Sequence, residues 1–117
     1  MASMKPMDIY VAEIPFEDGT GSKIRPALIS GVRHSQVLVF KITTKFEDKS
    51  ASVQAHRYKI IDLNTAGLYK QSYVDVAAQI DVPFSVLQKS RKTGKLSAID
   101  SVNLAKFVRE YRSKHGI

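Results

Sequence analysis

The sequence has no cysteine and no tryptophan, and none of its uninterrupted apolar runs is long. Without cysteine there is no disulfide framework, no thiolate zinc site, no iron–sulfur cluster and no cysteine nucleophile. The apolar run at residues 37–40 is far shorter than the roughly 20 residues that a membrane span requires. The first residues also lack the pattern of a secretory leader. These absences predict a soluble, cytoplasmic protein that does not associate with a membrane.

The length of 117 residues predicts a single domain spanning 1–117. A domain of this size buries roughly two-thirds of its unfolded surface, so an ordinary apolar core can stabilise it. Residues 1–7 contain three methionines and little pattern, and we expect this segment to be partly disordered.

Positive charge is concentrated at one end of the chain. The net charge is +7, from 18 Lys and Arg against 11 Asp and Glu. Residues 86–117 hold 8 basic and 2 acidic side chains, which leaves 10 basic and 9 acidic among residues 1–85. A basic block on a nearly neutral domain indicates a polyanionic partner such as nucleic acid or an acidic peptide; the alternative is a solvated, solubilising tail.

The first 85 residues predict short strands, and the remainder predicts helix and loop. Alternating β-branched and aromatic residues favour strands at 8–14, 27–30, 36–43, 58–63 and 72–76. Glycine and proline predict a loop at 16–26. After a short helical element at 82–87 comes a basic loop at 89–95 and then a helix at 97–115, capped by Ser97 and Asp100. The fold class is therefore α+β and β-dominated: a small, strongly curved β-barrel with a packed C-terminal helix.

Two segments carry the residues best suited to chemistry. Pro26 restricts Arg25 to an extended conformation, and an arginine directed in this way can bind two phosphate oxygens at once. Thr43 and Thr44 end the following predicted strand, where their hydroxyls can donate to a phosphate. The alternatives are a surface ion pair for Arg25 and simple β-propensity for the threonines. The three histidines lack metal-ligand spacing, so neither a metal nor another cofactor is predicted.

These segments resemble the MazF/PemK family, the endoribonuclease toxins of type II toxin–antitoxin systems. The resemblance rests on residues 8–15, the Gly/Ser loop, Arg25-Pro26 followed by an apolar strand, and a next strand ending in Thr43-Thr44. It is closest over residues 8–45 and weaker over 58–81. The resemblance implies an SH3-like barrel that forms a homodimer, cleaves single-stranded mRNA without a metal and is inhibited by an acidic antitoxin protein.

The resemblance also implies roles for particular residues. Arg25 would contact the scissile phosphate and Thr43 would hydrogen-bond it, while a 2′-hydroxyl attacks and leaves a cyclic phosphate. This chain lacks the glutamate that commonly precedes the family's Arg-Pro, and the arginine that follows its Gln in some members. The candidates for proton transfer are Glu17, Asp18, His34, His56, Asp75 and Asp81. The missing residues favour an alternative, a catalytically inactive SH3-like module that binds RNA or protein.

Residues that could contact RNA are basic, aromatic or polar side chains near these segments or in the basic stretch. Phe16 and Phe46 flank the predicted site and could stack on bases. The basic stretch could either steer RNA or receive an acidic antitoxin segment. The full set is Phe16, Ser22, Lys23, Thr44, Lys45, Phe46, Gln79, Lys89, Arg91 and Lys92.

Overall fold

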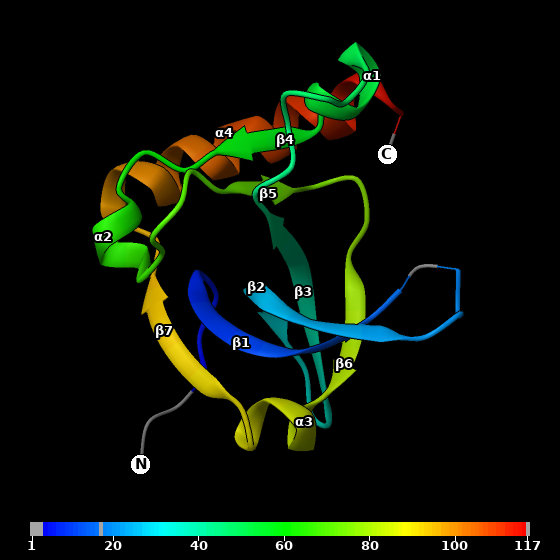
Figure 1. Cartoon of the computed structure of the whole chain (residues 1–117), viewed down its shortest axis with the longest axis vertical. Coiled ribbons are helices and arrows are strands. Elements are labelled where there is room, and N and C mark those ends of the chain that lie inside the picture. The colour runs from blue at the N-terminus through cyan, green and yellow to red at the C-terminus, as the bar shows by residue number, and fades with distance from the viewer. Residues whose placement is uncertain (1–3, 17, 117) are drawn as a thin grey trace.

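A computed structural model describes residues 4–16 and 18–116, and within these ranges seven strands form one curved antiparallel sheet (Figure 1). The strands lie in the order β4-β5-β3-β2-β1-β7, and β6 also pairs with β3. This confirms the β-dominated α+β fold with a C-terminal helix. The elements are β1 (Asp8–Pro15), β2 (Ser22–Val32), β3 (Gln36–Thr43), α1 (Ala51–Gln54), β4 (Arg57–Lys59), α2 (Leu63–Ala66), β5 (Tyr73–Asp75), β6 (Ile80–Pro83), α3 (Phe84–Gln88), β7 (Arg91–Lys95) and α4 (Ala98–Lys114).

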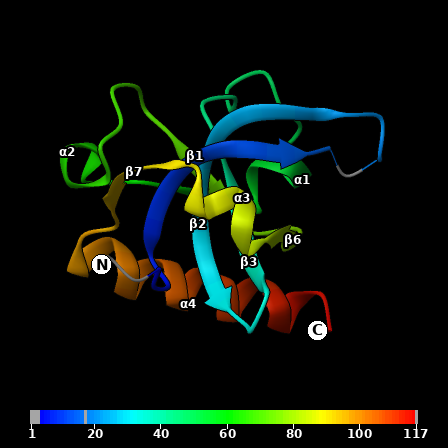
Figure 2. The same cartoon turned by 90° about the horizontal axis from the view of Figure 1, so that it is seen from below.

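Both faces of the central strands are apolar, and each belongs to its own core cluster. Successive strand residues point to opposite faces, so Ala27 and Ile29 join one cluster while Leu28 joins the other. The Leu28 face is covered by α4, which lies along one side of the sheet (Figure 2). The apolar face of α4 packs here, through Leu104, Phe107, Val108 and Tyr111.

A buried carboxylate anchors the beginning of α4. Asp100 is fully buried and accepts hydrogen bonds from the Tyr58 hydroxyl (2.6 Å) and from the backbone N–H groups of Ile61 (2.9 Å) and Asp62 (2.8 Å). Burial acts to raise the pKa of Asp100, but these hydrogen bonds together with that from Ser97 outweigh it and hold the pKa below its ordinary value. Burial, followed by the hydrogen bond and charge of Asp100, raises the pKa of Tyr58.

Several predicted boundaries are wrong in the middle of the chain. The predicted loop at 16–26 ends earlier, because β2 begins at Ser22 and its first residues pair with β1. Pro26, which lacks an N–H group, is accommodated within this strand opposite Val11. The predicted strand at 58–63 is strand only at Tyr58 and Lys59, the last two residues of β4, and the Asp62 side chain instead caps α2. The prediction omits β6, which pairs with β3 along residues 36–39.

The predicted basic loop at 89–95 is also wrong, because residues 91–95 form β7 and pair with β1 at the edge of the sheet. Charged side chains hid this strand from the sequence pattern, but lysines are common on edge strands. Gly94 permits β7 to pack closely against α2: a Cβ at this position would lie 2.4 Å from the Thr65 carbonyl oxygen.

The predicted C-terminal helix at 97–115 corresponds to α4, with Ser97 as its N-cap. Of the segment 1–7, residues 1–3 lie outside the described residues. Met7 is ordered by two backbone hydrogen bonds: its N–H group donates to Ile29 and its carbonyl oxygen accepts from Leu96. None of the helices in the described ranges has the length and hydrophobicity to cross a membrane.

Candidate functional site

One face of the β2–β3 hairpin changes from apolar to cationic toward the end that carries Arg25. Ala27 pairs with Lys41, and Ile29 pairs with Val39. Continuing this register by two residues brings Arg25 level with Thr43. Alternation places Arg25, Lys41 and Thr43 on the face that carries the Ala27 core cluster. The polar site is thus the open end of a hydrophobic core, where paired strands position Arg25, Lys41 and Thr43.

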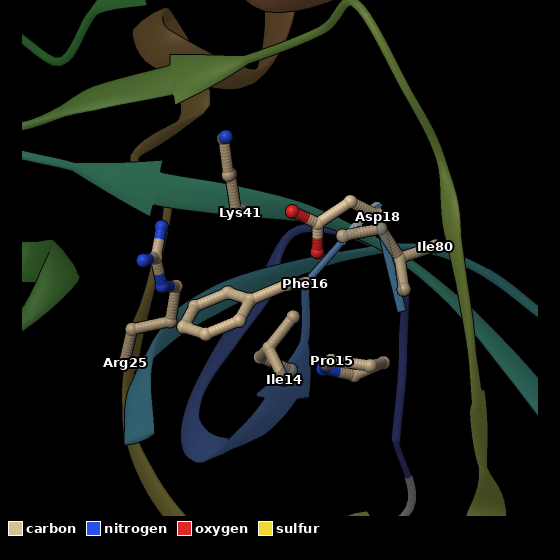
Figure 3. Close-up of a pocket in the computed structure, with 7 residues that line it drawn as sticks. All are labelled: Ile14, Pro15, Phe16, Asp18, Arg25, Lys41 and Ile80. Atoms are coloured by element: carbon tan, nitrogen blue, oxygen red, sulfur yellow. The ribbon is translucent and has the colours of Figure 1, made fainter. Parts of the chain in front are cut away.

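Arg25 and Lys41 separate two adjoining cavities. The first, of about 310 Å³, is lined by Ile14, Pro15, Phe16, Asp18, Arg25, Lys41 and Ile80. Figure 3 shows the charged ends of Arg25, Lys41 and Asp18 around one opening, with the Phe16 ring between Arg25 and Asp18 in that view. Phe16 is 41% exposed, which leaves part of its ring available to a ligand.

The second cavity, of about 330 Å³, is strongly basic. Among the described residues its lining contains six cationic side chains and no acidic one: Lys23, Arg25, Lys41, Lys45, Lys49 and Arg57, beside Ile24, Pro26, Ile42, Thr43 and Thr44. Cationic walls around a concave surface concentrate a positive potential, which attracts anions. The cavity is therefore suited to a phosphate or another polyanion.

The Thr43 hydroxyl is oriented by the backbone. Its Oγ1 accepts a hydrogen bond from the N–H group of Lys45 at 3.1 Å. A hydroxyl has one hydrogen to donate in addition to its acceptor lone pairs. The Lys45 N–H group occupies an acceptor position of Thr43 Oγ1, and the hydroxyl hydrogen can be donated to a ligand oxygen in the cavity.

Asp75 of β5 lies behind the basic cavity and holds two of its cations. Its Oδ2 atom is 3.2 Å from Arg57 Nε and 3.8 Å from Lys41 Nζ. Its Oδ1 atom is 3.2 Å from His56 Nδ1 and accepts the Ala77 N–H group at 3.0 Å. The carboxylate is buried and does not line either cavity. Asp75 thus arranges cations that face the cavity without facing it itself.

Asp18 is the acidic side chain that lines the first cavity among the described residues. Its Oδ1 atom accepts two hydrogen bonds from Thr20, from the hydroxyl at 2.7 Å and from the N–H group at 3.0 Å. These bonds, the side-chain one first, lower the pKa of Asp18. A lower pKa makes the carboxylate a weaker proton acceptor at neutral pH. Glu17, the neighbouring candidate, lies outside the described residues.

The other candidates for proton transfer lie away from the two cavities. His34 is in the turn between β2 and β3, at the opposite end of the hairpin from Arg25 and Thr43. Asp81 is exposed on β6, where it pairs with Leu38. His56 contacts Asp75 and packs edge-on against Tyr111, but it does not line either cavity.

The structure brings together only part of the predicted RNA-binding set. Lys23, Thr44 and Lys45 line the second cavity and Phe16 lines the first. Phe46 instead stacks on Tyr73, with ring centroids 4.3 Å apart, which occupies one of its two faces.

The remaining members of that set point elsewhere. Ser22 donates a hydrogen bond to Glu13, and Gln79 donates one to Ser30 beside a separate cavity next to α4. The basic stretch is at the β7 edge of the sheet, where Lys92 forms an ion pair with Asp8 at 3.3 Å. Three residues of the set, Lys89, Arg91 and Lys92, line neither of the two cavities described above.

Sequence reasoning missed Lys41, Lys49 and Arg57 as members of the site. Strand alternation could have found Lys41, because it interrupts the apolar series of residues 37 and 39 two positions before Thr43. Arg57 follows a short helix and reaches the cavity through the pairing of β4 with β5, which has no local sequence signal.

Comparison with known proteins supports the fold. No protein-family model matches the chain, and no curated protein matches it significantly. Thirty-four chains of solved structures do match. One of them is the Mycobacterium tuberculosis toxin MazF-mt6, with a TM-score of 0.64 and 25% sequence identity over 86% of this chain and 91% of that chain. The chain therefore has the fold of a MazF/PemK-family toxin, as the resemblance predicts.

Proposed function

We propose that this protein is the toxin of a cytoplasmic toxin–antitoxin pair and a metal-independent endoribonuclease that cleaves single-stranded mRNA. The observation that carries the proposal is the six-cation cavity, which contains Arg25 and Thr43 on a fold similar to that of the toxin MazF-mt6. A cavity with this charge and with an oriented hydroxyl donor is suited to a phosphodiester.

In the proposed reaction a ribose 2′-hydroxyl attacks the adjacent phosphorus. The O2′–P bond forms, the P–O5′ bond breaks, the O2′ proton is removed and O5′ gains a proton. Negative charge builds on the non-bridging oxygens between these steps. Arg25 and Lys41 lie where they can stabilise this charge, and Thr43 can donate a hydrogen bond to the same oxygens. The products are a 2′,3′-cyclic phosphate and a 5′-hydroxyl.

Proton removal falls to Asp18 among the described residues, since it is the acidic side chain at the cavity with Arg25. Because hydrogen bonds from Thr20 lower the pKa of Asp18, it contributes less as a base than a carboxylate of higher pKa would. Stabilisation of the phosphorane by the cations then supplies most of the rate acceleration.

An acidic antitoxin protein and a second copy of the chain are the proposed partners, and both follow from the likeness to the toxin. The positive net charge of +7 supports an acidic partner. Mass measurement by light scattering, with and without an added acidic antitoxin, tests both assignments.

The test of the reaction uses one single-stranded RNA and its all-deoxy counterpart, both incubated with the protein in EDTA. The proposal predicts that the RNA is cut, that the DNA stays intact and that the 5′ fragments end in a cyclic phosphate. Tight binding of the RNA without a product would contradict cleavage and would favour the inactive RNA-binding module. Cutting of the DNA would contradict attack by the 2′-hydroxyl.

A further inference from the structure

A chain of polar contacts runs from the buried Asp75 to the hydroxyl of Thr43. Asp75 Oδ2 accepts from Arg57 Nε at 3.2 Å, and Arg57 Nη1 donates to the Lys45 carbonyl oxygen at 2.7 Å. The N–H group of Lys45 in turn donates to Thr43 Oγ1 at 3.1 Å. The four residues come from different segments: Asp75 lies in β5, Arg57 in β4, Lys45 in the turn after β3, and Thr43 at the end of β3.

The guanidinium of Arg57 is the part of this chain that cannot be replaced by another cation. Its side chain is only 9% exposed, and its planar fork bonds the carboxylate and the carbonyl from two nitrogens at once. A lysine has one ammonium group on a flexible stem and cannot reproduce this fixed geometry. Arg57 thus restrains the backbone of Lys45 through its carbonyl group, and the N–H group of the same residue, in the preceding peptide unit, orients the Thr43 hydroxyl.

Neighbouring groups occupy both carboxylate oxygens of Asp75, which keeps Asp75 from accepting a proton from a substrate. Four groups already surround its two oxygens: Arg57 and Lys41 at Oδ2, and His56 and the Ala77 N–H group at Oδ1. Its side chain is 6% exposed and lines neither cavity. A base must be within hydrogen-bond reach of the proton that it removes.

We infer that Asp75 and Arg57 are a positioning pair: they hold the Lys45 backbone and the Lys41 ammonium group, so that Thr43 and Lys41 meet the phosphate in a fixed geometry. This inference rests on the proposed function for its effect on cleavage, but not for its effect on the Lys45 backbone. The pair acts through Thr43 and Lys41: Asp75 lines neither cavity, and Arg57, although it lines the basic cavity, has its Nε and Nη1 atoms bonded to Asp75 and to the Lys45 carbonyl oxygen.

The first test follows amide hydrogen exchange at Lys45 and needs no RNA. Arg57→Lys keeps the charge but removes the fork, and it is expected to speed exchange at Lys45 by about 10-fold or more as the carbonyl is released. Lys59→Ala is the matched control, because Lys59 is exposed on the same strand and lines neither cavity. Unchanged exchange at Lys45 in a folded Arg57→Lys variant would overturn the inference.

The second test is a double-mutant cycle on RNA cleavage. We expect Arg57→Lys to lower kcat about 10- to 100-fold with little change in KM, because misplacement of a contacting group acts on the chemical step. In a Thr43→Ala background, Arg57→Lys should lower kcat by a much smaller factor. In a Thr43→Ser background, which keeps the hydroxyl, it should lower kcat by the full factor again. Equal costs of Arg57→Lys in all three backgrounds would overturn the coupling.

The pH profile separates positioning from proton transfer for Asp75. Asp75→Asn should lower kcat and leave the shape of the acid limb of the kcat/KM profile unchanged; loss of that limb would show that Asp75 titrates as the base and would overturn the inference. If the wild-type protein does not cleave RNA, the proposed function fails, while the exchange rate of the Lys45 amide still decides whether Arg57 positions this segment.

Discussion

Arg25 of β2 and Lys41 of β3 together form the wall between two adjoining cavities, since both side chains line each of them. The register that pairs Ala27 with Lys41 explains this arrangement: Arg25 is two residues before Ala27 on the same face of β2. The two cations are therefore held by paired strands rather than by loops. A site built on strands needs little reorganisation when a substrate binds.

The buried carboxylate of Asp100 should control the stability of the fold. Asp100→Asn replaces a carboxylate that accepts several hydrogen bonds by an amide whose NH₂ group would face hydrogen-bond donors. We expect this substitution to lower the free energy of unfolding by about 2–3 kcal/mol. Urea denaturation measures this change, and Glu110→Gln, on the exposed side of α4, is the control. Equal stability of the two variants would contradict the anchoring role of Asp100.

The lowered pKa of Asp100 also predicts a loss of stability in acid. A carboxylate whose pKa is lower in the folded state stabilises the fold above its unfolded pKa of about 3.9. That contribution is lost as the pH falls through the folded pKa, because protonation neutralises the Asp100 carboxylate that accepts these hydrogen bonds. Urea midpoints between pH 2.5 and 5 should fall more steeply in the wild type than in Asp100→Asn; parallel curves would show that Asp100 does not contribute.

The raised pKa of Tyr58 predicts that stability falls as the pH rises in alkali. Its pKa is raised in the folded state, so its contribution is complete below the unfolded value of about 10 and is lost as the pH rises toward the folded pKa. The wild type should therefore lose stability above pH 10, and Tyr58→Phe should lose less of it over the same interval. Urea midpoints from pH 8 to 11.5 test this, and an identical alkaline slope in both proteins would contradict the assignment.

The two basic regions of the chain should respond differently to salt. Lys45 lines the basic cavity, whereas Lys89 lines neither cavity of the site. The association constant for a single-stranded all-deoxy oligonucleotide falls with salt, and Lys45→Ala should make the slope of log K against log salt concentration less negative by about 0.7. Lys89→Ala should leave the slope unchanged. A larger effect of Lys89→Ala in fluorescence titrations would place the nucleic acid on the basic edge strand instead.

The sequence was sufficient to predict the fold class and the C-terminal helix α4, because strand alternation and helix capping are local signals. It placed Arg25 and Pro26 in a loop, whereas both lie within β2. It also identified Thr43 at the end of its strand. It failed at β7, where basic side chains conceal an edge strand that pairs with β1, a segment far away in the chain.

The same limit applies to the site. The total charge of residues 86–117 drew attention to the C-terminal end, yet the cations that line the basic cavity come from residues 23–57. Acidic residues such as Asp75 cancel these cations in a count along the sequence. In space, however, Asp75 lies behind Lys41 and Arg57 and leaves the cavity lining positive. Charge counted along the chain cannot detect this separation, because it depends on the pairing of β4 with β5.

The most direct test of the central claim is the kcat/KM of Arg25→Ala for cleavage of a single-stranded RNA in EDTA, measured beside the control Lys59→Ala. We expect a loss of about 10²–10³-fold for Arg25→Ala, which is typical for removal of a charge that stabilises a transition state. We also expect a rate close to that of the wild type for Lys59→Ala. Equal cleavage by Arg25→Ala and the wild-type protein would contradict the account.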